Sequence, residues 1–262
     1  VNVNLGYAYT DAQDRQGTVS SQAISNFEET VRAISTQNIL APSQFSTRHN
    51  VTLATTFSQE FVKDLPTRFA FFVSAREGNP YSYVFDNPSV FGELDREDNI
   101  LLYVPTGIDD PNVDFSNTTD EEEAEIFDFL ERSGLSEFAG GVAPRNEFRD
   151  PWFVDVDFRF QQDLPMPIGG LRTIFYIDVE NVLNLIDSGS NVLREVNRGD
   201  VGEGVPVFDV DGVNDQGQYI IDALESNVDG LFGLDPNDPD DGFEVVSNQS
   251  LWAVQFGLRF EF

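Results

Sequence analysis

The last eleven residues of the chain, 252–262, alternate between two kinds of side chain. Trp252, Val254, Phe256, Leu258, Phe260 and Phe262 are large and apolar, whereas the intervening Ala253, Gln255, Gly257, Arg259 and Glu261 are polar or small. A period of two places these sets on opposite faces of a β-strand. A strand with one wholly apolar face belongs to a β-sandwich or to a membrane barrel, and the rest of the chain must distinguish the two.

Five further segments show a similar alternation. They lie at residues 1–10, 45–58, 68–76, 152–161 and 171–181, and the pattern of the third allows it to continue through residues 81–85. We therefore predict about six strands. Helices are expected around residues 24–34 and at 119–133, where Thr119 and Glu122 have the spacing of a capping box. The second helix is expected to pack its apolar residues on a neighbouring loop, with a lid over the barrel mouth as the alternative.

The connections between these strands alternate in length. Residues 59–67 and 163–170 are short, whereas residues 12–44, 86–150 and 186–249 are long. Long structureless connections are uncommon in soluble sandwiches, but outer-membrane barrels combine short periplasmic turns with long external loops. The expected fold class is therefore all-β, a transmembrane antiparallel β-barrel represented by about six C-terminal strands, with long extracellular loops that contain short helices. In this arrangement the C-terminus lies on the periplasmic side.

Acidic residues dominate the composition, with 46 Asp+Glu against 15 Lys+Arg and a formal net charge of -31. This balance excludes nucleic acid as a partner, because such binding requires cations that neutralise phosphates. Residues 86–150 contain 18 acidic and 4 basic residues, and residues 186–249 contain 15 and 2, so these two connections carry -27 of the net charge. The strands are nearly neutral, as expected for a wall in lipid that carries solvated acidic extracellular loops.

Charges of both signs lie on the polar faces of the predicted strands. The set expected to line the barrel lumen is Asp155, Asp157, Arg159, Asp178, Glu180, Arg259 and Glu261. Unpaired charges would be costly in a sandwich core, whereas a barrel interior is polar. A structural network of paired charges against a plug is the preferred interpretation, and a transport relay is the alternative.

Few residues are available for catalysis or metal binding. One His and no Cys leave little material for catalytic triads or thiolate sites, so no enzyme is expected. Asp209, Asp211 and Asp215 are spaced so that they could supply oxygen ligands for a weakly bound Ca²⁺, although Ile220 stands where an EF-hand needs glutamate. For these carboxylates, and for the acidic run at 235–242, a solvated acidic loop is the alternative. No other cofactor is expected.

Aromatic and basic residues flank the predicted strands. Trp152, Tyr81, Tyr83 and Tyr103 are expected in the aromatic belt at the membrane–water interface, and ligand stacking is a second interpretation of Trp152. Arg145 and Arg149 precede Trp152, where the chain is expected to re-enter the barrel.

Four segments in order resemble the C-terminal barrel of TonB-dependent outer-membrane receptors, most closely the Oar-like branch. They are NPYSYVF at residues 79–85, NILLYVP at 99–105, APRNEFRDPW at 143–152 and DVENVLNL at 178–185. The resemblance implies a barrel of about 22 strands with a plugged lumen and energised uptake of a scarce solute, coupled to the TonB complex through an N-terminal plug region. No plug or TonB box is recognisable here, so the chain is expected to be a fragment whose remaining strands and plug are its partners.

Two other functions fit the same strand pattern. One is an outer-membrane surface or adhesion protein whose acidic loops engage partners, and the other is a passive porin without transport coupling. A plug with a TonB box in the full-length protein would favour the receptor.

The resemblance also implies that the terminal Phe262 is recognised by the barrel-assembly machinery. Deletion of Phe262 from the full-length protein is therefore expected to impair outer-membrane assembly, measured as the amount of folded protein in the outer-membrane fraction. Normal assembly of the truncated protein would contradict this role.

Overall fold

The computed structural model describes residues 1–17, 20–23, 26, 30–33, 39–86, 100–165, 171–196, 204–222 and 243–261. The largest sheet contains β1 (Asn2–Tyr9), β4 (His49–Val62), β5 (Leu65–Arg76), β11 (Phe153–Leu164), β12 (Arg172–Glu180) and β17 (Ala253–Glu261). The other strands are β2 (Gln13–Asp14), β3 (Ala41–Pro42), β6 (Pro80–Asp86), β7 (Tyr103–Val104), β8 (Val113–Asn117), β9 (Gly141–Val142), β10 (Phe148–Arg149), β13 (Arg194–Val196), β14 (Gly204–Val213), β15 (Tyr219–Asp222) and β16 (Phe243–Val245). The helices are α2 (Asp120–Arg132), α3 (Val182–Ile186), α5 (Ser247–Ser250) and a 3-10 turn at Leu135–Phe138.

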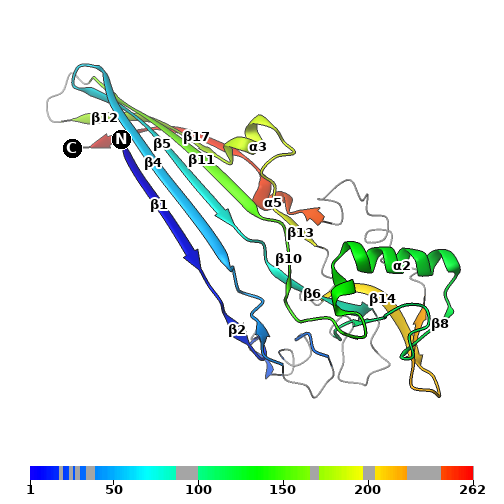
Figure 1. Ribbon diagram of the computed structural model, residues 1–262. Coiled ribbons are helices and arrows are strands. Elements are labelled where there is room, and N and C mark those ends of the chain that lie inside the picture. Colours follow the sequence, from blue (N-terminus) through cyan, green and yellow to red (C-terminus); the bar gives the residue numbers. More distant parts are fainter. Residues whose placement is uncertain are drawn as a thin grey trace.

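Six long strands form one antiparallel sheet in the order β1-β4-β5-β11-β12-β17 (Figure 1). Each of the six predicted segments overlaps one of these strands, and the predominance of β-structure confirms the predicted all-β class. The sheet is open, because within the described residues its edge strands β1 and β17 do not pair with each other. The described strands therefore form an open sheet and not a closed barrel.

Short and long connections lie at opposite ends of the sheet, which we call the turn end and the outer end (Figure 1). At the turn end, β4 and β5 are joined by Lys63 and Asp64, and Asp64 has a φ of 62°. The expected connection at 59–67 was too long, because pairing continues to Val62 and Leu65. The expected turn at 163–170 lies largely outside the described residues, but β11 extends to Leu164.

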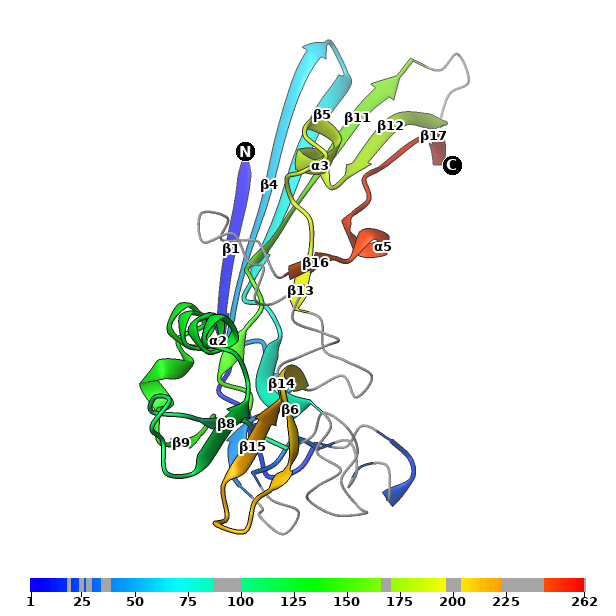
Figure 2. The same ribbon diagram turned by 90° about the vertical axis from the view of Figure 1, so that its right-hand side faces the viewer.

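Of the three long connections, the two acidic ones at residues 86–150 and 186–249 are folded in their described parts, which corrects the expectation of loops. They build a five-stranded sheet in the order β10-β6-β14-β15-β8, in which β6 pairs with β14, and β15 with β8, in parallel. Figure 2 shows this sheet beside α2, beyond the six long strands. We call the described residues of 80–150 and 204–222 the outer unit. Strand β6 belongs to it, so the predicted continuation of the third strand through residues 81–85 is wrong.

The outer unit has its own hydrophobic core. Its largest fully buried side chains include Phe85, Phe129, Phe208, Leu102 and Leu130, each at most 2% exposed. Leu102, Phe129 and Leu130 come from the connection at 86–150, and Phe208 comes from the connection at 186–249. The core therefore forms only when the two connections pack against each other. The NILLYVP segment at residues 99–105 contributes β7 and single β-bridges at Ile100 and Leu101.

The acidic helix α2 agrees with its prediction. The side chain of Thr119 accepts a hydrogen bond from the backbone N–H of Glu122 at 3.3 Å, and the Glu122 carboxylate accepts one from the backbone N–H of Thr119 at 2.6 Å. This reciprocal cap satisfies donors that a helix start leaves free. Ile126, Phe129 and Leu130 are buried in the core of the outer unit, so the packing interpretation of this helix is confirmed. The helix expected at 24–34 falls largely outside the described residues.

A buried carboxylate holds the turn that follows β7. Asp110, only 3% exposed, accepts hydrogen bonds from the backbone N–H groups of Thr106 and Asn112, each at 2.8 Å, and from the hydroxyl of Thr106 at 2.9 Å. Burial acts to raise the pKa of the Asp110 carboxyl, but these hydrogen bonds outweigh it and the pKa is lowered.

The outer unit should therefore lose stability in acid. The lowered pKa means that Asp110 contributes stability above its unfolded pKa of about 3.9 and that this contribution is lost as the pH falls through the folded pKa. Asp110→Asn should destabilise the outer unit by about 1–3 kcal/mol at neutral pH, because an amide places a donor opposite N–H groups. Hydrogen exchange of residues 103–115 between about pH 2.5 and 7, a range that spans this transition, would measure both effects, and an unchanged acid response in Asp110→Asn would contradict them.

Within the described part of the chain, no helix has the length and apolar character needed to cross a membrane.

Candidate functional site

The two faces of the six-stranded sheet form the candidate functional site. The register aligns side chains that are apolar, except for Thr55, into four rows that cross the sheet: Tyr7, Val51, Ala75 and Val154; Leu5, Leu53, Val73 and Val156; Val3, Thr55, Phe71, Phe158, Val179 and Val254; and Phe57, Phe69, Phe160, Ile177 and Phe256. Six strands about 4.8 Å apart make this apolar face about 24 Å wide.

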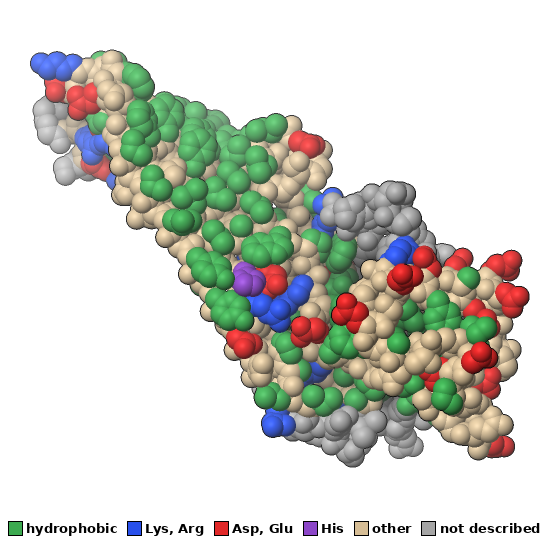
Figure 3. All heavy atoms as spheres, viewed as in Figure 1, with side chains coloured by type: hydrophobic (Ala, Val, Ile, Leu, Met, Phe, Trp, Pro, Cys, Tyr) green, Lys and Arg blue, Asp and Glu red, His purple; other side chains and the backbone are tan. Residues whose placement is uncertain are grey.

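The apolar face is not covered by another layer of the described chain. Leu5 at one edge is 74% exposed, Phe71 in the middle 46% and Phe256 at the other edge 75%. The rings of Phe71 and Phe158 lie 4.9 Å apart and those of Phe69 and Phe160 5.4 Å apart, so neighbouring strands contact each other along this face. Hydrophobic side chains cover most of the long sheet in Figure 3. Such a surface exceeds the apolar patches of a few hundred Å² that soluble monomers usually expose.

The last strand has the exposed face that its sequence predicts. Trp252, Val254, Phe256, Leu258 and Phe260 are between 44% and 75% exposed, whereas Phe262 lies outside the described residues. On the other face of β17, Gly257 lies directly beneath the ring of Tyr176, and a Cβ at this position would be 2.7 Å from the Tyr176 hydroxyl. Glycine here therefore allows the tyrosine to lie flat on the strand.

The opposite face of the sheet carries paired charges. Arg159 donates to both carboxylate oxygens of Asp178 at 2.5 and 2.6 Å, and Arg259 pairs with Glu261. The structure thus pairs four of the seven candidate lumen charges within the sheet. The Arg159–Asp178 pair joins β11 to β12, and the Arg259–Glu261 pair lies within β17.

Sequence reasoning missed the centre of a second ion-pair network on this face. Asp163, 5% exposed, lies 2.7 Å from both Arg68 and Arg172, and Arg172 also lies 3.2 Å from Glu261. Asp163 continues the alternate positions 155, 157, 159 and 161, so a longer prediction for that strand would have included it. These contacts connect β5, β11, β12 and β17 near the turn end.

The remaining candidate charges, Asp155, Asp157 and Glu180, lie nearer the outer end on the same face. Asp157 and Glu180 are on the adjacent strands β11 and β12. The Asp157 carboxylate accepts a hydrogen bond at 3.1 Å from the backbone N–H of Asn181, which follows Glu180. The carboxylate therefore helps to end β12 at this point.

A cluster of buried asparagines organises the outer end of β12. Asn181 has a φ of 51°, and its side-chain amide donates to the backbone carbonyls of Asn191 at 3.1 Å and Ser250 at 2.9 Å. Its side-chain oxygen accepts from Asn184 N–H and from the Asn191 amide. This cluster holds α3 beside the chain that enters β17, which gives the DVENVLNL segment a structural role.

Asn181→Asp should uncouple this junction. An aspartate tolerates the same left-handed backbone, but it removes the donors to two carbonyls and places charge beside them, which should cost about 2–4 kcal/mol. The expected result is faster hydrogen exchange at residues 182–193 and 247–252, whereas Asn184→Asp, which also loses donors but keeps the Asn181 contacts, should affect mainly residues 184–190. Equal protection of 247–252 in the wild type and Asn181→Asp would refute the role of this side chain.

Aromatic residues at the outer end divide into two groups, which corrects part of the expected belt. Tyr81 and Tyr83 are each 6% exposed in the core of the outer unit, and Tyr103 packs against that core. Burial raises the pKa of the Tyr83 hydroxyl well above its usual value. Trp152 is 51% exposed and its ring lies 6.1 Å from that of His49, so only Trp152 of the four predicted residues lies at the rim of the apolar face.

Arg145 and Arg149 lie in the connection between the outer unit and β11. The Arg145 guanidinium is buried and donates to the Asp14 carboxylate at 2.6 Å, which attaches the segment after β1 to the outer unit. Arg149 donates to the backbone carbonyl of Ser46 at 2.7 Å, and burial lowers its pKa. Both side chains therefore attach segments distant in the sequence rather than facing an open ligand site.

Two of the three candidate Ca²⁺ residues lie in a strand rather than in a loop, and Asp211 and Asp215 are exposed to solvent. Asp209 and Asp211 lie in β14, and Asp215 lies in the turn to β15. The described residues contain no group of three or more His, Cys, Asp or Glu side chains placed to hold a metal. The second acidic run, residues 235–242, lies outside the described residues.

No protein-family model, curated protein or solved structure matches this chain.

Proposed function

We propose that this chain is the C-terminal part of an outer-membrane β-barrel, and that the whole protein is a TonB-dependent receptor of the Oar-like kind that takes up a scarce solute. The observation that carries the proposal is the continuous exposed apolar face of six strands, opposite a face of paired charges. Lipid would stabilise the apolar face, and the polar lumen of a barrel would accommodate the charged face.

The height of the apolar face supports the membrane assignment. On β11 this face extends from Val154 to Leu164, with Gln162 as the one polar side chain among its six positions, about ten residues and therefore about 33 Å along the strand. At a strand tilt of about 40° this corresponds to a height of about 25 Å, the height of the apolar band on outer-membrane barrels. Apolar sheets of soluble sandwiches are instead covered by a second sheet.

The open edges of the sheet support its place in a larger barrel. Unpaired strand edges are not tolerated in lipid, so β1 and β17 should pair with further strands of the full-length protein. In this assignment the turn end and the C-terminus are periplasmic, and the acidic outer unit is extracellular. A plug, the TonB complex and the barrel-assembly machinery would be its partners.

Single cysteines test the two faces directly, because the chain has no native cysteine. Phe256→Cys and Gln255→Cys place a thiol on the apolar and polar faces of β17. In the assembled full-length protein, a membrane-impermeant maleimide should label the Gln255→Cys variant but not the Phe256→Cys variant, whereas a lipid-soluble maleimide should label Phe256→Cys. Equal labelling of both variants by the impermeant reagent would overturn the membrane assignment.

Transport coupling needs a separate test, since the folded acidic outer unit also suits an adhesion protein. Candidate solutes would be supplied to cells that do or do not express the full-length protein. A receptor should give uptake that stops when the proton gradient is dissipated. Uptake that persists would favour a passive porin, and binding of partners at the cell surface without uptake would favour the adhesion protein.

A further inference from the structure

Two ion pairs cross the boundary between the long sheet and the outer unit. Arg48 precedes β4 and Glu77 follows β5, whereas Glu147 and Arg149 lie in the outer unit at β10. Arg48 lies opposite Glu147, and Glu77 lies opposite Arg149. The positive and negative charges on one side therefore face their opposites on the other, and we call these four residues the boundary charges.

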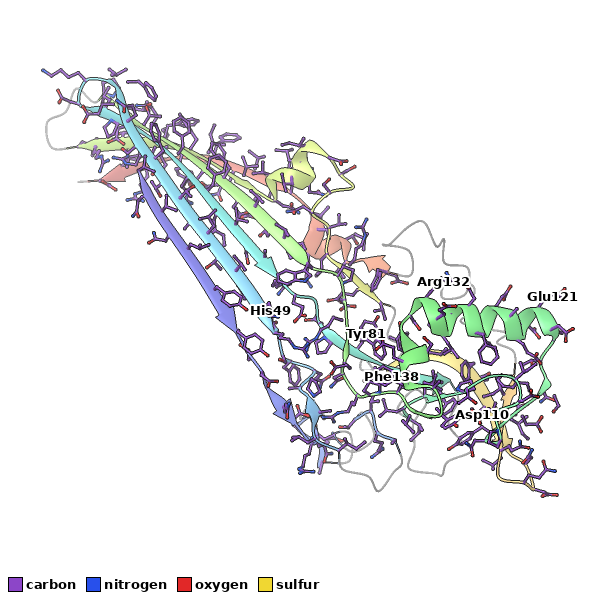
Figure 4. The ribbon with its side chains drawn as sticks, in the orientation of Figure 1. His49, Tyr81, Asp110, Glu121, Arg132 and Phe138 are labelled. Atoms are coloured by element: carbon purple, nitrogen blue, oxygen red, sulfur yellow. The ribbon has the colours of Figure 1, made fainter. Side chains whose placement is uncertain are left out.

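Strand pairing fixes the charges of each side in place. The backbone N–H of Glu77 donates to the His49 carbonyl at 3.0 Å, so Glu77 extends the pairing of β5 with β4. On the other side of the boundary, Phe148 of β10 pairs with Tyr81 of β6. Figure 4 shows His49 and Tyr81 on the two sides of this boundary, and basic and acidic side chains lie beside His49 in Figure 3.

Both crossing pairs stop short of a hydrogen bond. Arg149 Nη1 lies 3.8 Å from Glu77 Oε2, and Arg48 Nη2 lies 4.0 Å from Glu147 Oε1. Charge-assisted hydrogen bonds between such groups are about 2.7–2.9 Å long, and the two ion pairs centred on Asp163 reach 2.7 Å. Each pair at the boundary is therefore parted by about 1 Å more than a formed hydrogen bond.

The inner of the two pairs is buried and only partly satisfied. The side chains of Arg149 and Glu77 are 11% and 13% exposed. Arg149 Nη1 donates to the Ser46 carbonyl at 2.7 Å. Among the described residues, however, no hydrogen-bond partner meets Arg149 Nε, Arg149 Nη2 or Glu77 Oε2, all of which are buried. Unpaired buried donors and acceptors cost free energy, and each of these two side chains offers what the other lacks.

Gly78 provides a point about which the outer unit can turn. Its backbone lies so close to Asp150 that a Cβ would be 2.2 Å from the Asp150 carbonyl oxygen. The Asp150 N–H also donates to the Asn79 carbonyl at 3.0 Å. A small rotation about this contact moves Glu147 and Arg149 relative to the sheet without separating the two backbones.

We propose that the boundary charges are a latch with two positions, the parted one seen in this structure and a closed one in which both ion pairs are hydrogen-bonded. A rotation that brings β10 about 1 Å closer to β4 and β5 closes both pairs together. Arg149 then keeps its bond to Ser46 and donates to Glu77 from Nε or Nη2. The latch goes beyond the proposed function, because it sets the position of the outer unit on the sheet whether or not the sheet lies in lipid.

Distances between two spin labels test the latch in the full-length protein. Leu5→Cys on β1 and Ala124→Cys on α2 place one label on the sheet and one on the outer unit, both at exposed positions. Pulsed electron paramagnetic resonance should show two label separations. The share of the closed position should fall between about 0.05 and 1 M salt, because screening weakens the outer pair of Arg48 and Glu147. Glu77→Gln should lower that share at least about tenfold, since hydrogen bonds between charged groups contribute a factor of this size.

Two further variants distinguish the latch from a general effect of charge. Glu77→Arg combined with Arg149→Glu restores opposite charges across the boundary and should recover the closed position. Glu137→Gln makes the same change as Glu77→Gln at an exposed residue of the outer unit and should leave the distances unchanged. One label separation that responds neither to salt nor to Glu77→Gln would overturn the latch, and so would an equal response to Glu137→Gln. Neither result bears on the membrane assignment, which the maleimide labelling tests.

Discussion

Phe71→Arg is expected to prevent stable assembly of the protein, whereas Phe72→Arg on the same strand should be tolerated. The two phenylalanines are adjacent and almost equally exposed, at 46% and 43%. Phe71 is paired with Phe158 in the middle of the apolar face, and Phe72 is paired with Asp157 on the polar face. If the apolar face lies in lipid as proposed, an arginine near its middle should cost about 2–4 kcal/mol. An arginine at position 72 would instead lie beside the Asp157 carboxylate and could pair with it.

Comparing the two variants tests whether the apolar face lies in a membrane or in water. The amount of folded protein in the outer-membrane fraction and its urea midpoint after extraction would be measured for both variants. If both faces were in water, exposed arginines at the two positions would have similar small effects. Equal behaviour of Phe71→Arg and Phe72→Arg would therefore contradict the proposed function, and a defect in Phe72→Arg alone would reverse the assignment of the faces.

Gly78→Ala is expected to disrupt the junction between the long sheet and the outer unit. Gly78 is buried, and a Cβ at this position would lie 2.2 Å from the Asp150 carbonyl oxygen and 2.5 Å from its carbon. These are backbone atoms, and they are held in place because Asp150 N–H donates to the Asn79 carbonyl at 3.0 Å. No side-chain rotation can relieve the clash, so the cost should reach about 3 kcal/mol or more.

The junction also includes residues 195 and 196, which belong to the long connection at 186–249. The Asp150 carboxylate accepts a hydrogen bond from Val196 N–H at 3.0 Å, and the Asn79 amide donates to Glu195 at 3.0 Å. Limited proteolysis should therefore cut Gly78→Ala in both connections at lower protease concentration than the wild type. Gly189→Ala is the control, since its nearest neighbour would be an ordinary 3.7 Å away. Unchanged proteolysis of Gly78→Ala would show that the junction can shift at little cost.

The long strands were predictable because their information is local. Alternation of side chains requires only that one face be apolar, so segments such as 252–261 and 152–161 were identified without knowledge of their partners. The cap of α2 was equally local, because Thr119 and Glu122 are three residues apart. Strand ends were less accurate, as at Asp163, because pairing with a neighbour extends a strand beyond its clearest pattern.

The outer unit was not predictable in this way. Its parallel pairs join β6 to β14 and β8 to β15, segments that are separated by about a hundred residues or more in the sequence. Tyr81 and Tyr83 were mistaken for belt residues for the same reason, because aromatic residues beside a predicted strand end give no indication that a distant strand will cover them. Asp209 and Asp211 were likewise placed in a loop rather than in β14.

The sequence by itself determined which side chains share a face of each long strand and how the charge divides between the strands and the connections. These follow from the period of two and from composition. Only the tertiary structure decided that the two acidic connections fold against each other, that Asp163 joins two arginines, and that His49 meets Trp152. Each of these depends on register between segments far apart in the chain, and register is set by the summed packing and hydrogen bonding of whole strands, which no single segment contains.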